Sequence, residues 1–243
     1  MVRAPELDEN VAKGGLLRCA APSWLRDAVL SGRAYGVDAG VLFIGLAMLW
    51  AGVVGVSATA DVPYGDEYDY ARIAGRLSEV GRFERPPETA AMFVTAAYWG
   101  ALFVSVLGQG LSSVRLSVLA AAWLAMTAVS WYLAWQGVSR AWRLLLVGVA
   151  FVNPLTVPLL FAFTTDMIFA AQLSVSLVLY LVGTERASAR WLVAGSAAGA
   201  VALGNREIGV LVLPGVLIAL WLRHAPVRLY VAAAAPLLLA FLI

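Results

Sequence analysis

Residues 61–88, DVPYGDEYDYARIAGRLSEVGRFERPPE, form the longest polar run after the N-terminal segment of an otherwise apolar chain. This run holds seven of the fifteen acidic residues. Within it, apolar residues recur at helical spacing on one face and charged residues occupy another. The apolar positions are Tyr70, Ile73, Ala74, Leu77 and Val80. The pattern predicts an amphipathic helix that lies on a membrane surface with its apolar side down.

Asp66 and Glu67 come at the first turn of this predicted helix. There the backbone N–H groups and the helix dipole favour ionised carboxylates, by about 0.3–1 kcal/mol each. One interpretation is that the two acids only cap the helix. Their position directly after a predicted membrane span favours the other interpretation, in which they belong to a functional site.

The composition predicts an integral membrane protein. Of the 243 residues, 62% are hydrophobic and 13% are charged, with a mean hydropathy of +0.84, whereas soluble domains carry about 25% charged residues. A net charge of +2 without a basic block does not indicate nucleic-acid binding. Cys19 and His224 are the only cysteine and histidine, which excludes an intrachain disulfide and a multi-histidine metal site.

Seven membrane spans are predicted, and one further apolar segment decides their orientation. If residues 89–108 crossed the membrane, the three later arginine-bearing loops would lie outside, against the positive-inside rule. If the segment lies in the interface or re-enters, these loops join the N-terminus in the cytoplasm. We therefore predict that it does not cross. The predicted spans are 39–58, 115–135, 144–161, 167–182, 191–203, 208–222 and 229–243.

The predicted fold class is therefore all-α and integral to the membrane. Residues 1–38 are expected to form a cytoplasmic N-terminal segment, and residues 39–243 a transmembrane module. The first outer loop, 61–114, would carry the acidic motif and amphipathic or re-entrant helices. Because the sequence stops within its last predicted span, a C-terminal portion is expected to be absent.

Thr164-Thr165-Asp166 interrupts apolar sequence on both sides. An aspartate in hydrocarbon costs about 2.5–3.5 kcal/mol, so Asp166 should face protein or water. Capping of the following helix by these side chains is one interpretation. The other places Asp166 beside Asp66 in an outward-facing cavity.

Asn205-Arg206-Glu207 divides the apolar stretch 191–222. As one helix this stretch would be about 48 Å long, well beyond the roughly 30 Å core of a bilayer. A hairpin with its tip at these residues is therefore predicted. Arg206 either binds a phosphate through its fork-shaped guanidinium, or pairs with Glu207 or reaches lipid headgroups.

Several short motifs follow one another between residues 66 and 116. They are Asp66-Glu67, Tyr70-Ala71, the amphipathic helix, Gly81, Pro86-Pro87, an apolar stretch and Arg115-Leu116. Their order resembles the first outer loop of the GT-C membrane glycosyltransferases, in the branch that contains protein O-mannosyltransferases and the aminoarabinose transferases that modify lipid A. The resemblance covers the N-terminal transmembrane portion of that fold.

The resemblance implies transfer of a sugar from a polyprenyl-phosphate donor to a glycan, lipid or protein acceptor on the outer face, with inversion at the anomeric carbon. Asp66 would act as general base or acceptor binder, and Asp166 would be a further catalytic acid. Glu67 would be the partner of Asp66 or, with it, would bind a divalent cation. Which acid is the base stays open.

Four residues are candidates for substrate binding: Tyr70, Arg115, Arg206 and Glu207. In the GT-C enzymes a basic residue, often lysine, at the corresponding hairpin binds the lipid phosphate, which implies that role for Arg206. Arg115 either anchors its helix at the interface or holds an anionic ligand. Tyr70 either stacks on a sugar or packs in the core.

The expected location is the plasma or inner membrane, with a cytoplasmic N-terminus and the site on the outer or periplasmic face. Two other classes stay open. Intramembrane aspartate and arginine also mark the pathways of transporters and flippases, although no inverted repeat is visible. A non-catalytic scaffold with a GT-C-like core is the third class. The C-terminal portion expected to be absent is either truncated or supplied by a partner chain.

Overall fold

The computed structural model describes residues 45, 47, 63, 65–83, 92–151 and 153–242. Over these residues the chain forms helices and no strand, which confirms the all-α prediction. The predicted N-terminal segment 1–38, most of the first predicted span and the Pro86-Pro87 motif lie outside the described residues.

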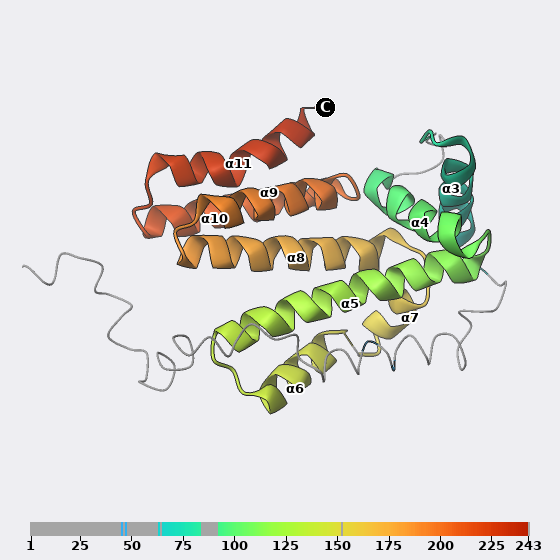
Figure 1. The fold of residues 1–243 in the computed structure, drawn as a ribbon, viewed down its shortest axis with the longest axis horizontal. Helices are drawn as coiled ribbons and strands as arrows, with labels where there is room; N and C mark the ends of the chain where they lie inside the picture. The colour runs from blue at the N-terminus through green and yellow to red at the C-terminus, as the bar shows by residue number, and fades with distance from the viewer. Residues whose placement is uncertain are drawn as a thin grey trace, which may run out of the picture.

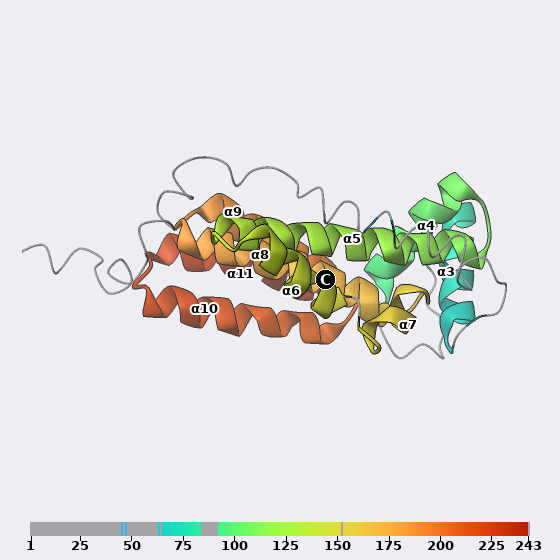
Figure 2. The ribbon, with the colours of Figure 1, turned by 90° about the horizontal axis from the view of Figure 1, so that it is seen from below.

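The described helices form an elongated bundle with α3 and α4 at one end (Figure 1). Their bounds are α3 Glu67–Val80, α4 Val94–Leu107, α5 Leu111–Trp135, α6 Arg140–Phe151, α7 Thr156–Leu160, α8 Thr165–Glu185, α9 Ala189–Leu203, the 3-10 helix η4 Glu207–Leu211, α10 Val212–Leu222 and α11 Val227–Phe241. Helices α5, α8 and α10 run away from the α3 end, and α6, α9 and α11 return toward it (Figures 1 and 2).

Two helices are long and apolar enough to cross a membrane, namely α5 and α8. With 21 residues, α8 is about 31 Å long, close to the roughly 30 Å of a bilayer core. Shorter apolar helices accompany them: α4, α9, the continuous η4–α10 segment, and α11. These features support a membrane protein.

Apolar sequence is interrupted within the predicted span 144–161 and, as predicted, at Asn205-Arg206-Glu207. Helix α6 ends at Phe151 and α7 begins at Thr156. Between them, the side-chain oxygen of Asn153 accepts hydrogen bonds from the backbone N–H groups of Leu155 and Thr156, at 3.0 Å each. Helix α9 ends before the Asn205-Arg206-Glu207 step, and α10 returns along the bundle, so this stretch is a hairpin (Figure 1).

Helix α4 does not run the length of the bundle, because both of its ends lie at the α3 end (Figure 1). Its beginning is tied to the tip of the α9–α10 hairpin. The backbone N–H of Phe93 donates to the carbonyl of Asn205, and that of Thr95 to the carbonyl of Gly204, at 3.3 Å each. The first N–H groups of a helix have no partner within it, and here the carbonyl groups of Gly204 and Asn205, just after α9, supply partners.

Helices α8 and α9 approach closely at glycines. A Cβ atom on Gly183 would lie 2.8 Å from the backbone nitrogen of Leu192, and one on Gly195 would lie 3.0 Å from that of Tyr180. The Ser176 hydroxyl donates to the carbonyl of Gly195 at 2.8 Å. Small residues allow such backbone approach in membrane helices, where packing and interhelical hydrogen bonds replace the hydrophobic effect as the attraction.

Gly183→Ala should destabilise the fold, because the new methyl group meets backbone atoms that have no side-chain freedom to move aside. We expect a loss of about 1–3 kcal/mol, the usual range for overpacking. The matched control is Gly148→Ala in α6, where an added Cβ meets nothing within 4 Å. The control should be neutral, or stabilising by up to about 1 kcal/mol through helix propensity. Equilibrium unfolding in detergent micelles measures both, and equal stabilities would contradict the close contact.

Candidate functional site

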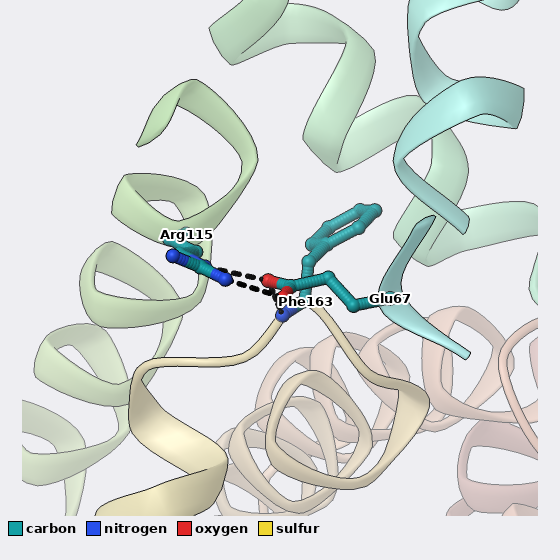
Figure 3. Close-up of polar contacts among 3 residues, drawn as sticks. All are labelled: Glu67, Arg115 and Phe163. Carbon is teal, nitrogen blue, oxygen red and sulfur yellow. Dashed lines mark hydrogen bonds and ion pairs between the residues drawn. The ribbon is translucent and has the colours of Figure 1, made fainter. Parts of the chain in front are cut away.

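A buried ion pair lies at the α3 end. Glu67 is 0% exposed and Arg115 is 2% exposed. Nε of Arg115 donates to Oε1 of Glu67 at 2.7 Å, and Nη2 donates to Oε2 at 2.6 Å (Figure 3). The backbone N–H of Phe163 also donates to Oε1, at 2.8 Å. One carboxylate therefore joins the start of α3, the first turns of α5 and the loop that precedes α8.

This pair corrects two expectations. Arg115 is not an interfacial anchor, because it is buried and engages a carboxylate of its own chain. The Arg115 side chain is also too buried to make the expected contact with an anionic ligand. Glu67 is buried with both oxygens engaged inside the protein, so it does not face a substrate or a cation in solution. The two side chains therefore hold the start of α3, α5 and the loop before α8 in position.

The apolar face of α3 is covered by protein. Tyr70, Ile73, Ala74 and Leu77 are all buried, and a Cβ atom on Gly100 of α4 would lie 3.2 Å from that of Ala74. The prediction of an amphipathic helix is confirmed, but the expectation that its apolar side lies on the membrane is wrong. Helical spacing identifies an apolar face, and here α4 covers it in place of lipid.

Val80 departs from the predicted apolar face, because its side chain is 63% exposed. It is the last residue of α3, and Gly81 follows it in the left-handed conformation with φ 70°. The chain turns away at this glycine, as at many helix ends, and among the described residues the Val80 side chain is left largely exposed.

Asp66 occupies the position just before α3 and is exposed. Its backbone carbonyl accepts the first hydrogen bond of the helix, from the N–H of Tyr70 at 3.2 Å. Its side chain makes no capping hydrogen bond. The capping interpretation is therefore not what the structure shows, and the Asp66 carboxylate is open to solvent.

Asp166 and Arg206 form a second ion pair at the same end of the bundle. Nη2 of Arg206 lies 2.7 Å from Oδ1 of Asp166. The same guanidinium donates to the hydroxyl of Thr165 through Nε at 3.1 Å and Nη2 at 2.7 Å. Arg206 is 35% exposed and Asp166 is 45% exposed, so a ligand in solution can reach this pair. Arg206 thus pairs with Asp166 rather than with its neighbour Glu207.

The backbone around this pair is held by Asn205, which is fully buried. Its side-chain amide donates to the carbonyl of Thr165 at 3.2 Å, which fixes the hairpin tip to the start of α8. Thr164 stands at the capping position of α8 but makes no side-chain capping bond. The capping interpretation of Thr164-Thr165-Asp166 is therefore wrong, because these side chains face the hairpin or the interior.

Tyr70 packs in the core with its ring, and nearby charged residues affect the pKa of its hydroxyl group. Its ring stacks on Phe93 with centroids 4.3 Å apart, which confirms core packing for its ring. Burial raises the pKa of the Tyr70 hydroxyl above its usual value, and the negative charge of Asp66 raises it further. The charge of Arg206 opposes this rise and that of Asp166 adds to it. The three charged residues therefore lie within electrostatic reach of one hydroxyl group.

The structure thus places Asp66 and Tyr70 at the start of α3 and links this turn, through the Phe93 ring and its backbone bond to Asn205, to the Asp166–Arg206 pair. It places Glu67 and Arg115 in the core. Glu207 is exposed at the start of η4. A triad of histidine, cysteine or carboxylate side chains able to hold a metal ion is not found among the described residues. The open groups are therefore carboxylates that can take up a proton and a guanidinium that can bind an anion.

Sequence reasoning missed three contributors to this site. Thr165 accepts two hydrogen bonds from Arg206, and Asn205 fixes the hairpin tip; each adjoins a residue that the sequence had singled out. Phe163 acts through its backbone N–H, which leaves no trace in residue type.

Comparison of the chain with protein families, with curated proteins and with solved structures finds no match. The resemblance to the GT-C enzymes rests on the short motifs between residues 66 and 116.

Glu67→Gln should destabilise the protein strongly, because it leaves the Arg115 charge buried without its counter-charge. We expect a loss of about 3–5 kcal/mol in unfolding free energy, measured in detergent micelles. Asp69→Asn is the matched control on the same helix. Its ion pair with Arg72, at 3.4 Å, has partners 56% and 54% exposed, so its loss should cost under about 1 kcal/mol.

The double substitution Glu67→Met with Arg115→Met tests the same pair from the other side. Replacing a buried ion pair by apolar residues of similar volume is often neutral, so the double variant should be more stable than Glu67→Gln. A double variant at least as unstable as the single one would show that the charges do not act as a pair.

Proposed function

We propose that this chain forms the transmembrane part of a GT-C-type glycosyltransferase that moves a sugar from a polyprenyl-phosphate donor to an acceptor. The observation that carries the proposal is that the Asp166–Arg206 ion pair lies beside the start of α3, where Asp66 and Tyr70 stand. The Tyr70 ring stacks on Phe93, and the backbone N–H of Phe93 donates to the carbonyl of Asn205, next to Arg206. A carboxylate near an acceptor hydroxyl can act as general base. A cation near the donor phosphate can stabilise the charge that builds on the leaving group.

The proposed topology has seven spans in the plasma or inner membrane, with the α3 end on the outer side. Two features support it. Helix α4 keeps both of its ends at the α3 end, as expected for a segment that does not cross. The loops that contain Arg186 and Arg223, and the loop that Arg140 follows, lie at the other end of the bundle (Figures 1 and 2), where the positive-inside rule places the cytoplasm.

Donor binding exchanges one anion for another on Arg206. In the structure Nη2 of Arg206 is shared between Asp166 and the Thr165 hydroxyl. A phosphodiester anion competes for the same guanidinium, whose fork geometry suits phosphate. Because the pair is partly exposed, the lipid phosphate can replace Asp166. The released Asp166 carboxylate is then available to the acceptor beside Asp66.

In the transfer step, the acceptor hydroxyl oxygen attacks the anomeric carbon while Asp66 takes up the hydroxyl proton. The bond between the anomeric carbon and the phosphate oxygen breaks, and the electron pair leaves on the polyprenyl phosphate, which Arg206 holds. Attack opposite the leaving group inverts the anomeric centre. Asp66 suits the role of base because it is exposed and free of a capping hydrogen bond. The Glu67–Arg115 pair fixes its backbone.

Asp66→Asn and Arg206→Gln should separate binding from chemistry. The first removes the base, so we expect at least a hundredfold loss of sugar release from polyprenyl-phosphate mannose or glucose, to water or to membrane acceptors. It should bind polyprenyl phosphate as the wild type does. Arg206→Gln should weaken that binding, measured by native mass spectrometry of the purified protein.

The matched controls are Asp69→Asn, one turn further along α3, and Arg223→Gln, at the opposite end of the bundle. Both should keep wild-type turnover and binding. Full turnover by Asp66→Asn would remove Asp66 as base. If polyprenyl phosphate binds at no concentration tested, the enzyme proposal fails, and coupled uptake by reconstituted vesicles would then favour the transporter alternative.

A further inference from the structure

A cavity of about 220 Å³ lies among four helices, α4, α5, α8 and α9. The described residues that line it carry apolar side chains, apart from Gln172 and the indole group of Trp99. Leu124, Ile168 and Val201 are among the apolar ones. Apolar cavities of about 150 Å³ stay free of water and bind small hydrocarbons. This cavity is therefore large enough for part of a hydrocarbon chain, and its walls offer little to a polar ligand.

Trp99 of α4 forms a fixed wall of the cavity. Its indole N–H donates to the carbonyl of Ser117 in α5 at 2.8 Å, which holds the ring in one orientation. Its ring also packs on Phe103, with centroids 5.3 Å apart. A wall that is already ordered costs little further entropy when a ligand binds. The cavity is thus formed before any ligand enters it.

Hydrogen bonds of Thr95 close the cavity toward the candidate site. The Thr95 hydroxyl donates to the carbonyl of Val201 at 2.8 Å and accepts from the amide of Gln172 at 3.4 Å. The backbone N–H of Thr95 donates to the carbonyl of Gly204 at 3.3 Å. Thr95 therefore joins two wall residues to the hairpin tip that carries Arg206. A chain attached to an anion on Arg206 meets these bonds before it reaches the cavity.

The cavity opens sideways, on the surface of the bundle. Leu124 is 51% exposed and Val201 is 45% exposed, and both line it. On α8 the lining residues extend from Ile168 to Val175, about 10 Å along the helix axis, in the half of α8 nearer α3. If α8 crosses the bilayer, this depth lies within its hydrocarbon core. The opening then faces lipid chains and not water.

We propose that this cavity binds one acyl chain of a membrane phospholipid, which enters from the surrounding bilayer. The chain and the cavity walls are both apolar. Within a bilayer the hydrophobic effect does not favour protein over lipid as surroundings for the chain. Binding is instead favoured by the packing contacts that an unfilled cavity lacks. A bound chain would contact all four helices. This site does not depend on the proposed sugar transfer.

Photo-crosslinking tests the proposal on the full chain in phosphatidylcholine vesicles that contain a trace of phosphatidylcholine with a diazirine in one acyl chain. Mass spectrometry should find more label on residues 168–175 and 198–201 than on Ile218 and Trp221 of α10, which are exposed outside the cavity. Ala198→Phe should lower the cavity label about tenfold or more, because its phenyl ring takes the space of the chain.

The matched control is Ala197→Phe, the same substitution at the preceding, exposed residue of α9, which should keep the wild-type label. Equal labelling of the cavity and of α10 in the wild type would overturn the proposal, since it would show only general contact with lipid. Displacement of the label by added polyprenyl phosphate would assign the cavity to the donor tail instead. Crosslinks between two chains in place of lipid label would assign it to a second copy.

A second variant decides the outcome if Ala198→Phe does not fold. Val175→Phe narrows the cavity from α8 and should also lower the label. Undiminished labelling in whichever of the two variants folds would contradict binding in this cavity.

Discussion

The Glu67 carboxylate is the point on which the α3 end of this protein depends. It accepts hydrogen bonds from Arg115 of α5 and from the backbone of Phe163, residues separated from it by 48 and 96 positions. Burying two charges is costly, and the cost is offset only when geometry and further hydrogen bonds satisfy both. The bidentate contact and the Phe163 N–H meet that condition. The constraint fixes the beginning of α3, and with it the backbone of Asp66.

The remaining charges divide between the two ends of the helices. The exposed residues Asp66 and Asp166 lie with Arg206 at one end, and the loops that contain or adjoin Arg140, Arg186 and Arg223 lie at the other. Between them, α5 and α8 offer apolar surface of bilayer length. The length of α8 therefore sets the distance between these two groups of charged residues.

Much of the fold could be predicted from the sequence because periodicity and interruptions are local. The helix from Glu67 and the hairpin tip at Asn205 each follow from a few neighbouring residues. The partners of those elements are not local. Helical spacing showed that Tyr70 and Leu77 share a face, but lipid and α4 are equally apolar, so the spacing did not show which covers that face.

The same limit explains the candidate site. Asp66, Asp166 and Arg206 were identifiable because charge is rare and expensive in apolar sequence. The structure pairs Asp166 with Arg206 and links this pair through Phe93 to the start of α3. The roles of Glu67 and Arg115 depend on burial, which residue type does not reveal.

The Asp166–Arg206 pair differs from the Glu67–Arg115 pair in its exposure to solvent. A buried pair such as Glu67–Arg115 is costly to open, because each charge would remain in a medium of low dielectric constant. A pair that is one-third to one-half exposed is screened by water, and its strength is correspondingly modest. Arg206 can therefore exchange its carboxylate for another anion at little cost, while Thr165 keeps the guanidinium in place. One ion pair holds the architecture and the other stays open to exchange, and burial alone distinguishes them.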